Sequence, residues 1–228
     1  ISTEKSIFYG EKRMKRDSTI RQAMETRNFN FDRNSMEQFR TAITYSIEKN
    51  HATKTISYKD RIARDQYWYD EDRTFNWKIL PETVKIGEYE TQKAETTFAG
   101  RKWFAWFTQD LPFIDGPYKF SGLPGLIVKV EDEKGDYSFD LKETKKIAEL
   151  PNFESRFGNN IKVKRSEFLK QQEKFNKDPM SFFQNQGGGF AMRMGGNQNP
   201  QNEAERRKMM EERLKEEAKA NNNPLEKN

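Results

Sequence analysis

Residues 83–108 read TVKIGEYETQKAETTFAGRKWFAWFT, and this stretch decides the fold class. Residues 83–98 and 101–108 are rich in Thr, Val, Ile and aromatic side chains, which is typical of β-strands. Ala99-Gly100 lies between them, and a two-residue link of this kind favours a tight hairpin. The stretch therefore predicts two antiparallel strands, the first over residues 83–98 and the second over residues 101–108.

The second of these strands carries large side chains on both faces. Because successive side chains of a strand point to opposite faces, one face would hold Trp103, Ala105 and Phe107. Phe104 and Trp106 would then lie on the other face. A strand with apolar residues on both sides is expected to be covered on both sides, at least along part of its length.

Further strands are predicted on both sides of this hairpin. An alternation of apolar and polar residues indicates a half-buried strand from Thr41, with Ile43, Tyr45 and Ile47 on one face. The other strand candidates are residues 54–58, 66–69, 74–79, 126–130 and 137–141, the last two forming a second hairpin. Pro81 should end the strand before it, because proline cannot donate to a ladder. Consecutive hairpins predict a mainly β fold with a single curved antiparallel sheet, like a meander or half-barrel.

A helical pattern follows the predicted sheet. Ser166 can cap its start, and Asp178-Pro179 stops it. The residues on one stripe of this helix are Phe168, Leu169, Gln172 and Phe175. The pattern predicts one amphipathic helix over residues 166–176, packed on the sheet.

Composition divides the chain into four parts. Residues 1–40 form a basic N-terminal arm or helix, residues 41–180 the β-domain, residues 181–202 a linker rich in Gly, Gln and Asn, and residues 203–228 a charged helical tail. The apolar side chains of the tail that can hold it to another surface are Met209, Met210 and Leu214. Because an isolated helix of this kind is marginal in water, we expect it to order against its own domain or a partner.

Composition also excludes several classes of site. The 228 residues include no cysteine and one histidine, His51, which excludes disulfides, thiolate nucleophiles and zinc sites rich in Cys or His. His51 is expected to be solvated, and a cuprous site built from Met192, Met194, Met209 and Met210 is a minor alternative. The 41 basic residues are nearly balanced by 36 acidic ones, which argues against a nucleic-acid partner. We expect no cofactor, no metal and no transmembrane segment.

The candidate binding residues are aromatic. Trp103, Trp106, Tyr89 and Tyr118 belong to a set that either fills a core or lines a groove for a small apolar ligand or an extended peptide. Arg101 is expected to form a buried ion pair with one of three carboxylates, Asp110, Asp115 or Asp136. A hydrolase that pairs Asp115 with Asp136 or Glu131 is the minority alternative, because no spacing in the sequence points to it.

Glycine and proline concentrate between the two predicted hairpins. The residues concerned are Gly116, Pro117, Gly122, Leu123, Pro124 and Gly125, in the order Gly-Pro and then Gly-Leu-Pro-Gly. Prolines with a fixed φ and glycines with a permissive one favour a compact structural loop. A loop that lets a ligand approach the backbone is the minority alternative.

The hexapeptide Gly122–Ile127, with the upstream elements Gly100-Arg101, Ala105-Trp106 and Gly116-Pro117, resembles the GLPGLI family over roughly Trp77 to Leu141. This resemblance implies a Bacteroidota protein, exported after loss of a signal peptide and located in the periplasm or at the outer membrane. It also implies genes close to those of outer-membrane transport proteins, and a curved sheet similar to that of periplasmic lipoprotein carriers. No reaction follows from it.

Asp17-Ser18-Thr19 resembles the short O-glycosylation acceptor motif of Bacteroidota, with Ser18 as the acceptor. Helix capping explains the same three residues equally well.

The sequence thus favours a non-catalytic exported subunit or accessory protein of an outer-membrane assembly. The β-domain would act as a rigid body, and the terminal segments would dock on an outer-membrane protein such as a TonB-dependent transporter or another β-barrel. The alternative is a periplasmic carrier or binding module that holds a lipid or peptide on an aromatic-lined face of the sheet.

Overall fold

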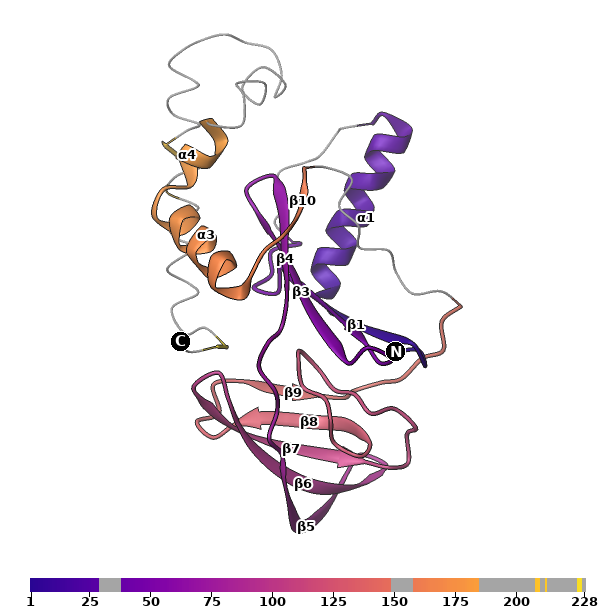
Figure 1. The fold of residues 1–228 in the computed structure, drawn as a ribbon. Coiled ribbons are helices and arrows are strands. Elements are labelled where there is room, and N and C mark those ends of the chain that lie inside the picture. Colours follow the sequence, from indigo (N-terminus) through magenta and orange to yellow (C-terminus); the bar gives the residue numbers. More distant parts are fainter. Residues whose placement is uncertain (29–37, 149–157, 185–207, 210–211, 213–224, 227–228) are drawn as a thin grey trace. The chain divides into compact units, whose positions relative to one another are not determined.

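The structure is a computed structural model of the 228-residue chain, and it describes residues 1–28, 38–148, 158–184, 208–209, 212 and 225–226 (Figure 1). The chain forms two compact units. The first contains Ile1–Tyr58, Asp70–Glu154 and Pro224–Asn228, and the second contains Lys59–Tyr69 and Ser155–Asn223.

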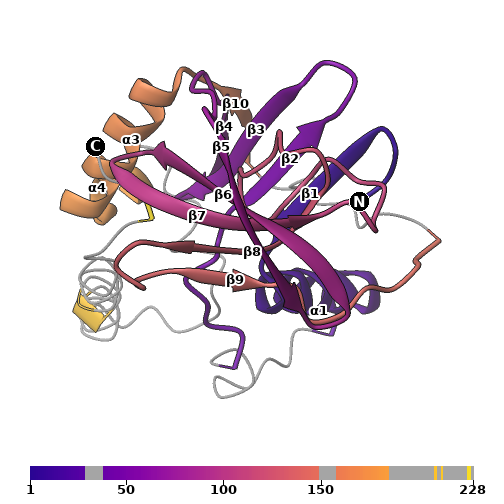
Figure 2. The same cartoon turned by 90° about the horizontal axis from the view of Figure 1, so that it is seen from below.

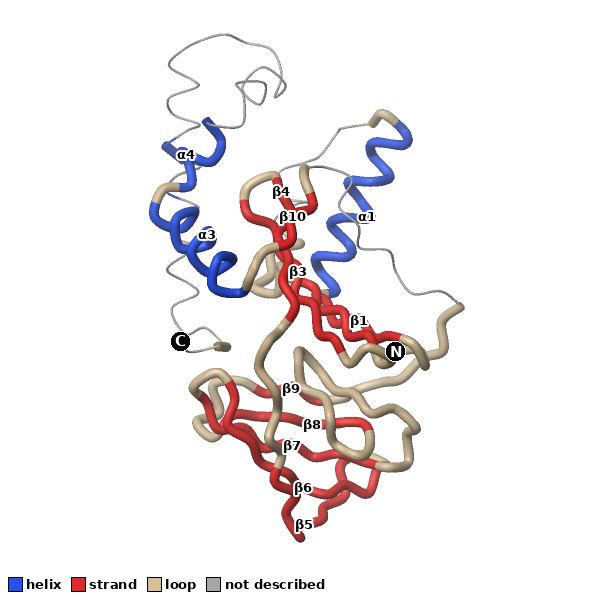
Figure 3. The backbone as a smooth tube through the Cα atoms, viewed as in Figure 1, coloured by secondary structure: helices blue, strands red, loops and turns tan. Residues whose placement is uncertain are grey.

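In the described part of the chain, ten strands form two sheets. Figure 3 shows their arrangement. The first sheet has the order β1 (Lys5–Tyr9), β2 (Ser46–Asn50), β3 (Thr55–Ile62), β4 (Asp65–Asp70) and β10 (Asn160–Lys162). The second has the order β5 (Lys78–Ile86), β6 (Tyr89–Phe98), β7 (Arg101–Thr108), β8 (Leu126–Asp132) and β9 (Ser138–Asp140), with all neighbours antiparallel (Figure 2). The mainly β prediction is confirmed, with the strands divided between two sheets where one curved sheet was expected.

The hairpin of β6 and β7 is the one that the sequence predicts at Ala99-Gly100. Both residues have positive φ, 51° and 72°, as a two-residue turn between twisted strands requires. Phe98 pairs with Arg101 across the turn, and Gln92 pairs with Phe107 near the other end.

The predicted strand 83–98 is wrong in length, because the chain reverses at Gly87-Glu88 and forms a second hairpin, β5 with β6. Pro81 lies inside β5 and does not end it. β5 is an edge strand, and its register shifts between Ile79 and Thr83. Proline is tolerated at an edge or a bulge because no ladder donor is needed there.

The N-terminal segment is more than a basic arm. All five residues of β1 pair with β2, so residues 5–9 belong to the first sheet. Helix α1 (Glu11–Thr26) follows, and Gly10 O accepts from Met14 N in its first turn. Ser18 therefore lies in the middle of α1 and, like its neighbours Asp17 and Thr19, does not cap the start of the helix.

The predicted C-terminal helix is confirmed as α3 (Arg165–Lys177), followed by α4 (Pro179–Gln184). Within the second unit, the buried Phe168 of α3 packs on Tyr69 of β4, with ring centres 5.3 Å apart. Ser166 does not cap α3, because Lys164 occupies the N-cap position and makes no side-chain cap bond. The predicted linker beyond Gln184 and nearly all of the predicted helical tail lie outside the described residues.

The core of the first unit is completed by the loop that joins β7 to β8. Phe120 of this loop is fully buried and packs on Trp103 of β7, with ring centres 4.8 Å apart. Leu123 is also buried. Gly125 makes the close approach possible, because a Cβ at this position would overlap Thr108 O of β7. The predicted structural loop thus fills the inner face of the second sheet.

We expect Gly125→Ala to lower the free energy of unfolding by about 3 kcal/mol, because the backbone of β7 must move to admit the methyl group. Gly135→Ala is the matched control, since Gly135 also has positive φ (72°) but has open space around it. The control should cost only about 1 kcal/mol, the strain of alanine in that conformation. Urea denaturation of the two variants measures the difference, and equal losses would show that the close approach at Gly125 does not matter.

Candidate functional site

A buried lysine holds the loop between β7 and β8 to the first sheet. Lys49 Nζ on β2 donates to Asp115 Oδ1 at 2.6 Å, to Gly116 O at 2.5 Å and to Phe120 O at 2.8 Å. The side chains of Lys49 and Asp115 are 4% and 2% exposed. Burial lowers the pKa of Lys49, and the charge of Asp115 and its hydrogen bond act in the opposite direction. All three protons of the ammonium therefore have acceptors, and the loop has a defined position.

Arg101 is buried between two carboxylates. Its Nη1 donates to Asp132 Oδ2 at 2.8 Å and to Asp136 Oδ2 at 2.7 Å. Asp136 was among the predicted partners, and Asp132 was not. Asp115 pairs with Lys49 instead. The hydrolase alternative would pair Asp115 with Asp136. In the structure, Asp115 is bound to Lys49 and Asp136 to Arg101.

A third buried cluster, which sequence reasoning missed, joins Lys119 to Glu71 and Arg73. Lys119 Nζ donates to Glu71 Oε2 at 2.5 Å, and both side chains are fully buried. Arg73 binds the same carboxylate through two parallel hydrogen bonds of 2.7 and 2.8 Å. Burial alone would raise the pKa of Glu71, but the hydrogen bond from Arg73 and the charge of Lys119 outweigh it and lower the pKa to about 2.

The predicted aromatic residues do not form one site. Trp103 is fully buried and Tyr118 is 3% exposed, so both belong to the core. Trp103 Nε1 donates to Phe98 O at 3.2 Å. Tyr89 is half-buried at the β5–β6 turn, and Trp106 is half-buried on the opposite face of β7 from Trp103. A single aromatic-lined groove made of these residues is therefore absent from the described part of the chain.

Trp106 belongs to a surface of different character, the lysine-aromatic face, which consists of Lys93, Lys102, Phe104, Trp106 and Lys129. The register places Trp106 between Lys93 on β6 and Lys129 on β8. The two ammonium nitrogens lie 5.7 and 4.9 Å from the centre of the indole ring. Lys93 and Lys102 flank Phe104 at 5.0 and 5.1 Å. Cation–π attraction of this kind orders the rings while leaving them half-exposed.

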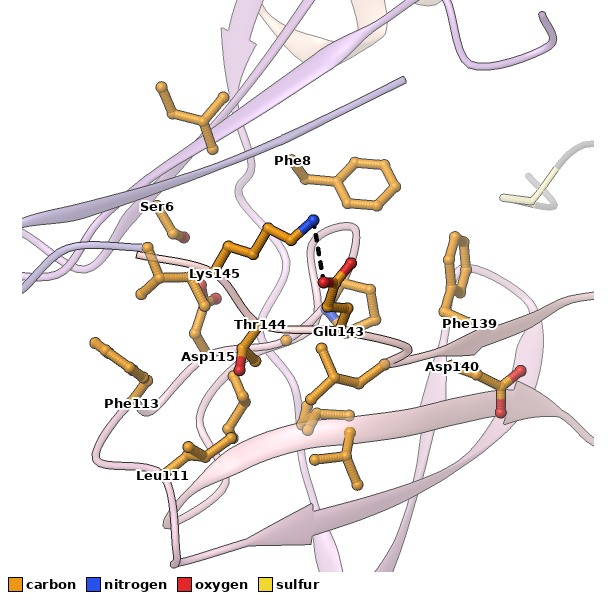
Figure 4. A pocket seen from close by; sticks show the side chains of 18 of the residues that line it. Ser6, Phe8, Leu111, Phe113, Asp115, Phe139, Asp140, Glu143, Thr144 and Lys145 are labelled. Carbon is orange, nitrogen blue, oxygen red and sulfur yellow. Dashed lines mark ion pairs between the residues drawn. The ribbon is translucent and has the colours of Figure 1, made fainter. Parts of the chain in front are cut away.

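A cavity of about 870 Å³ lies within the first unit (Figure 4). Its walls come from β1, the β7–β8 loop, β8, β9 and the segment after β9, with Phe8, Phe113 and Phe139 among the apolar lining residues. Ser6 lines the cavity as well and is 3% exposed. Within the described residues, the hydroxyl of Ser6 has no hydrogen-bond partner. Glu143 and Lys145 pair at 3.0 Å and are largely exposed.

The remaining predicted site residues are scattered. Met209 is 57% exposed, while Met192, Met194, Met210 and Leu214 lie outside the described residues. The backbone N–H of His51, in the turn after β2, donates to Glu4 O. In the described part of the chain, no group of three or more His, Cys, Asp or Glu side chains could hold a metal ion. The helices described there are all too short or too polar to cross a membrane.

Comparisons with known proteins give a family of unknown function and a fold. The family described as "Protein of unknown function (Porph_ging)" matches residues 96–129, from the end of β6 through β7 and the loop into β8. Two solved structures of PNGF-II, in the C2 and P21 space groups, are similar with TM-scores of 0.51 and 0.53. Their sequences are 17% and 18% identical to this chain, so the similarity concerns the fold alone.

The PNGF-II matches cover 75% of this chain and 28% of the PNGF-II chain. This chain therefore corresponds to less than a third of that protein. No curated protein sequence matches the chain.

The buried Glu71 makes the stability of the protein depend on pH. Its pKa falls from an ordinary 4.5 to about 2 on folding, so its contribution is complete above 4.5 and is lost as pH falls toward 2. That difference corresponds to roughly 3 kcal/mol. Glu71→Gln should therefore lower the free energy of unfolding at neutral pH. The decrease of this free energy between pH 5 and pH 2 should also be smaller in Glu71→Gln than in wild type.

Urea denaturation across this pH range measures the effect. Glu82→Gln is the control, because Glu82 is 63% exposed and pairs with Lys93 at the surface, where an ion pair contributes about 0.5 kcal/mol or less. If the free energy of unfolding depends on pH in the same way in Glu71→Gln and in wild type, the prediction is wrong.

Proposed function

We propose that this chain is a non-catalytic, exported accessory subunit of an outer-membrane protein assembly, and that it contacts its partner through the lysine-aromatic face. The observation that carries the proposal is the position of Trp106, half-exposed and flanked by Lys93 and Lys129 on a rigid sheet. Tryptophan is enriched among the residues that dominate protein interfaces, and a ring already ordered by its neighbours loses little conformational entropy on binding.

The buried charges support a non-catalytic role. Lys49 is matched by Asp115, and Arg101 by Asp132 and Asp136. Lys119 and Arg73 are matched by Glu71 and Glu226. Charges that already satisfy one another inside the core hold the fold together, and they are poorly placed to exchange protons with a substrate.

Two further points support a role within a larger assembly. The fold accounts for only part of the PNGF-II chain, which shows that it can occur as one portion of a longer protein. The resemblance to the GLPGLI family supports export to the periplasm or the outer membrane, beside outer-membrane transport proteins. Lys93, Lys102 and Lys129 pair with Glu82, Glu95 and Glu131 of the chain itself, so the face offers a partner ordered aromatic rings among balanced charges.

Trp106→Ala should reduce the amount of the copurifying partner at least tenfold, because truncation of a central interface tryptophan removes an anchor side chain. The measurement is affinity purification of the tagged full chain from its native envelope, with quantitative mass spectrometry of the proteins recovered. Val84→Ala is the control, since Val84 is an exposed apolar residue (47%) on the edge strand β5. Equal recovery of outer-membrane proteins by wild type and Trp106→Ala would refute the assignment of this face.

The cavity of Figure 4 favours a second candidate function, a periplasmic carrier or binding module. Its volume of about 870 Å³ lies in the range of small-molecule sites, roughly 300–1,000 Å³. A ligand was expected on the inner face of the second sheet, but Phe120 and Leu123 pack there. The cavity is therefore the better candidate for a ligand-binding site. A buried hydroxyl without a partner, that of Ser6, suits a ligand with an apolar body and one polar group.

A fluorescent long-chain fatty acid tests this second function. We expect saturable binding to the full chain, and at least tenfold weaker binding to Phe139→Asp, which places a charge in the apolar wall. Phe139→Leu, which keeps the wall apolar, is the control. Ser6→Ala should weaken binding severalfold without lowering the stability of the ligand-free protein, since no existing hydrogen bond is lost. Binding that is unchanged in Phe139→Asp would rule the cavity out.

A further inference from the structure

The end of the chain returns to the first unit and contacts its third buried cluster. Glu226 Oε1 accepts from Lys119 Nζ at 2.5 Å and from Tyr118 Oη at 2.6 Å. Its Oε2 accepts from Arg73 Nη2 at 2.7 Å. Three donors from two separate segments therefore converge on one carboxylate. The side chain of Glu226 is 14% exposed, so these contacts are largely shielded from water.

Glu226 balances the charges of the cluster. Lys119 and Arg73 carry two positive charges, and Glu71 supplies one negative charge. Glu226 brings a second negative charge to a lysine whose side chain is fully buried. An unbalanced buried charge is costly, so the cluster attracts a carboxylate strongly.

The cluster is also built to recognise a carboxylate in particular. Arg73 and Lys119 are charged donors, and burial raises the pKa of Tyr118 well above its ordinary value, so that its phenol remains a donor. Lys119 Nζ lies 5.1 and 5.4 Å from the ring centres of Tyr58 and Tyr118, which shield it from water. Tyr118 has a φ of 53°, a conformation that is unfavourable for tyrosine. Such a conformation persists only where the surrounding contacts fix the residue.

Glu226 reaches these partners without help from local sequence. Lys119 is 107 residues away in the sequence, and Arg73 is 153 residues away. The end of the chain thus contacts the cluster as a peptide ligand contacts a receptor. We infer that Lys119, Arg73 and Tyr118 form a binding site for an acidic peptide segment, and that Leu225-Glu226 of the chain's own C-terminal tail is its resident ligand.

This site changes the role expected of the tail. The sequence suggested that the tail orders on its own domain or on a partner through Met209, Met210 and Leu214. The contacts of the tail with Arg73, Tyr118 and Lys119 are made by the carboxylate of Glu226. An acidic segment of another protein would have to compete with Glu226 for the same three donors. The inference does not depend on the lysine-aromatic face or on the cavity.

Hydrogen exchange on the full chain tests the site. Amides of Leu225 and Glu226 should exchange at least tenfold faster in Glu226→Gln than in wild type, because the charged partner of Lys119 is lost. Tyr118→Phe, which removes one donor and keeps the ring, should give a smaller increase of severalfold. Glu212→Gln is the matched control, since it neutralises an exposed glutamate of the same tail. Exchange at Leu225 and Glu226 that is the same in all four proteins would overturn the proposal.

Binding in trans provides the second test. The full-length Glu226→Gln protein, in which the resident ligand is weakened, should bind a synthetic peptide of residues 221–228 saturably in a calorimeter. The same peptide with Glu226→Gln should bind at least tenfold more weakly. Equal affinities for the two peptides would show that the carboxylate is not recognised. A wild-type dimer that dissociates in Glu226→Gln would assign the ligand to a second copy and overturn the assignment to the chain's own tail.

Discussion

The buried ammonium of Lys49 is the interaction on which the rest of the first unit depends. A lysine without water needs acceptors for all three of its protons, and Asp115, Gly116 and Phe120 supply them. Because two of the acceptors are backbone carbonyls, the loop that follows β7 has one position relative to β2. That position brings Phe120 onto Trp103 and also fixes one wall of the cavity.

Buried charge is a general feature of this chain and explains how it folds with little apolar content. Charged residues make up 34% of the sequence and hydrophobic residues 33%. Three clusters, centred on Lys49, Arg101 and Lys119, place cations and carboxylates together where an apolar core would otherwise be expected. Such clusters are less stabilising than good apolar packing. They favour one arrangement of the chain over others, because a buried charge that lacks its partner is costly. The Lys119 cluster also includes Glu226 from the end of the chain, so a buried charge can serve binding as well as folding.

Elements that depend on neighbouring residues could be predicted from the sequence, and features that depend on distant contacts could not. The β6–β7 hairpin and helix α3 follow from local patterns, a two-residue turn and an apolar stripe. The break at Gly87-Glu88 was missed because Thr83 to Phe98 has a uniform strand composition on both sides of it. Pro81 was misjudged because its effect depends on whether the strand is at an edge, which a single segment does not reveal. Alternation correctly placed Trp103 and Trp106 on opposite faces of β7, but which face is core depends on what packs against it, and only Trp103 is fully buried.

The sequence by itself determined the mainly β class, the main hairpins, the C-terminal helix and the absence of cysteine chemistry, because each of these depends on neighbouring residues or on composition. Only the tertiary structure decided that the strands form two sheets, that Asp115 pairs with Lys49, and that Glu226 meets Lys119 across 107 residues. A lysine and a glutamate carry no mark of their partner in the sequence, since any opposite charge satisfies them equally. Their pairing is chosen when the backbone brings one particular carboxylate into a place from which water is excluded.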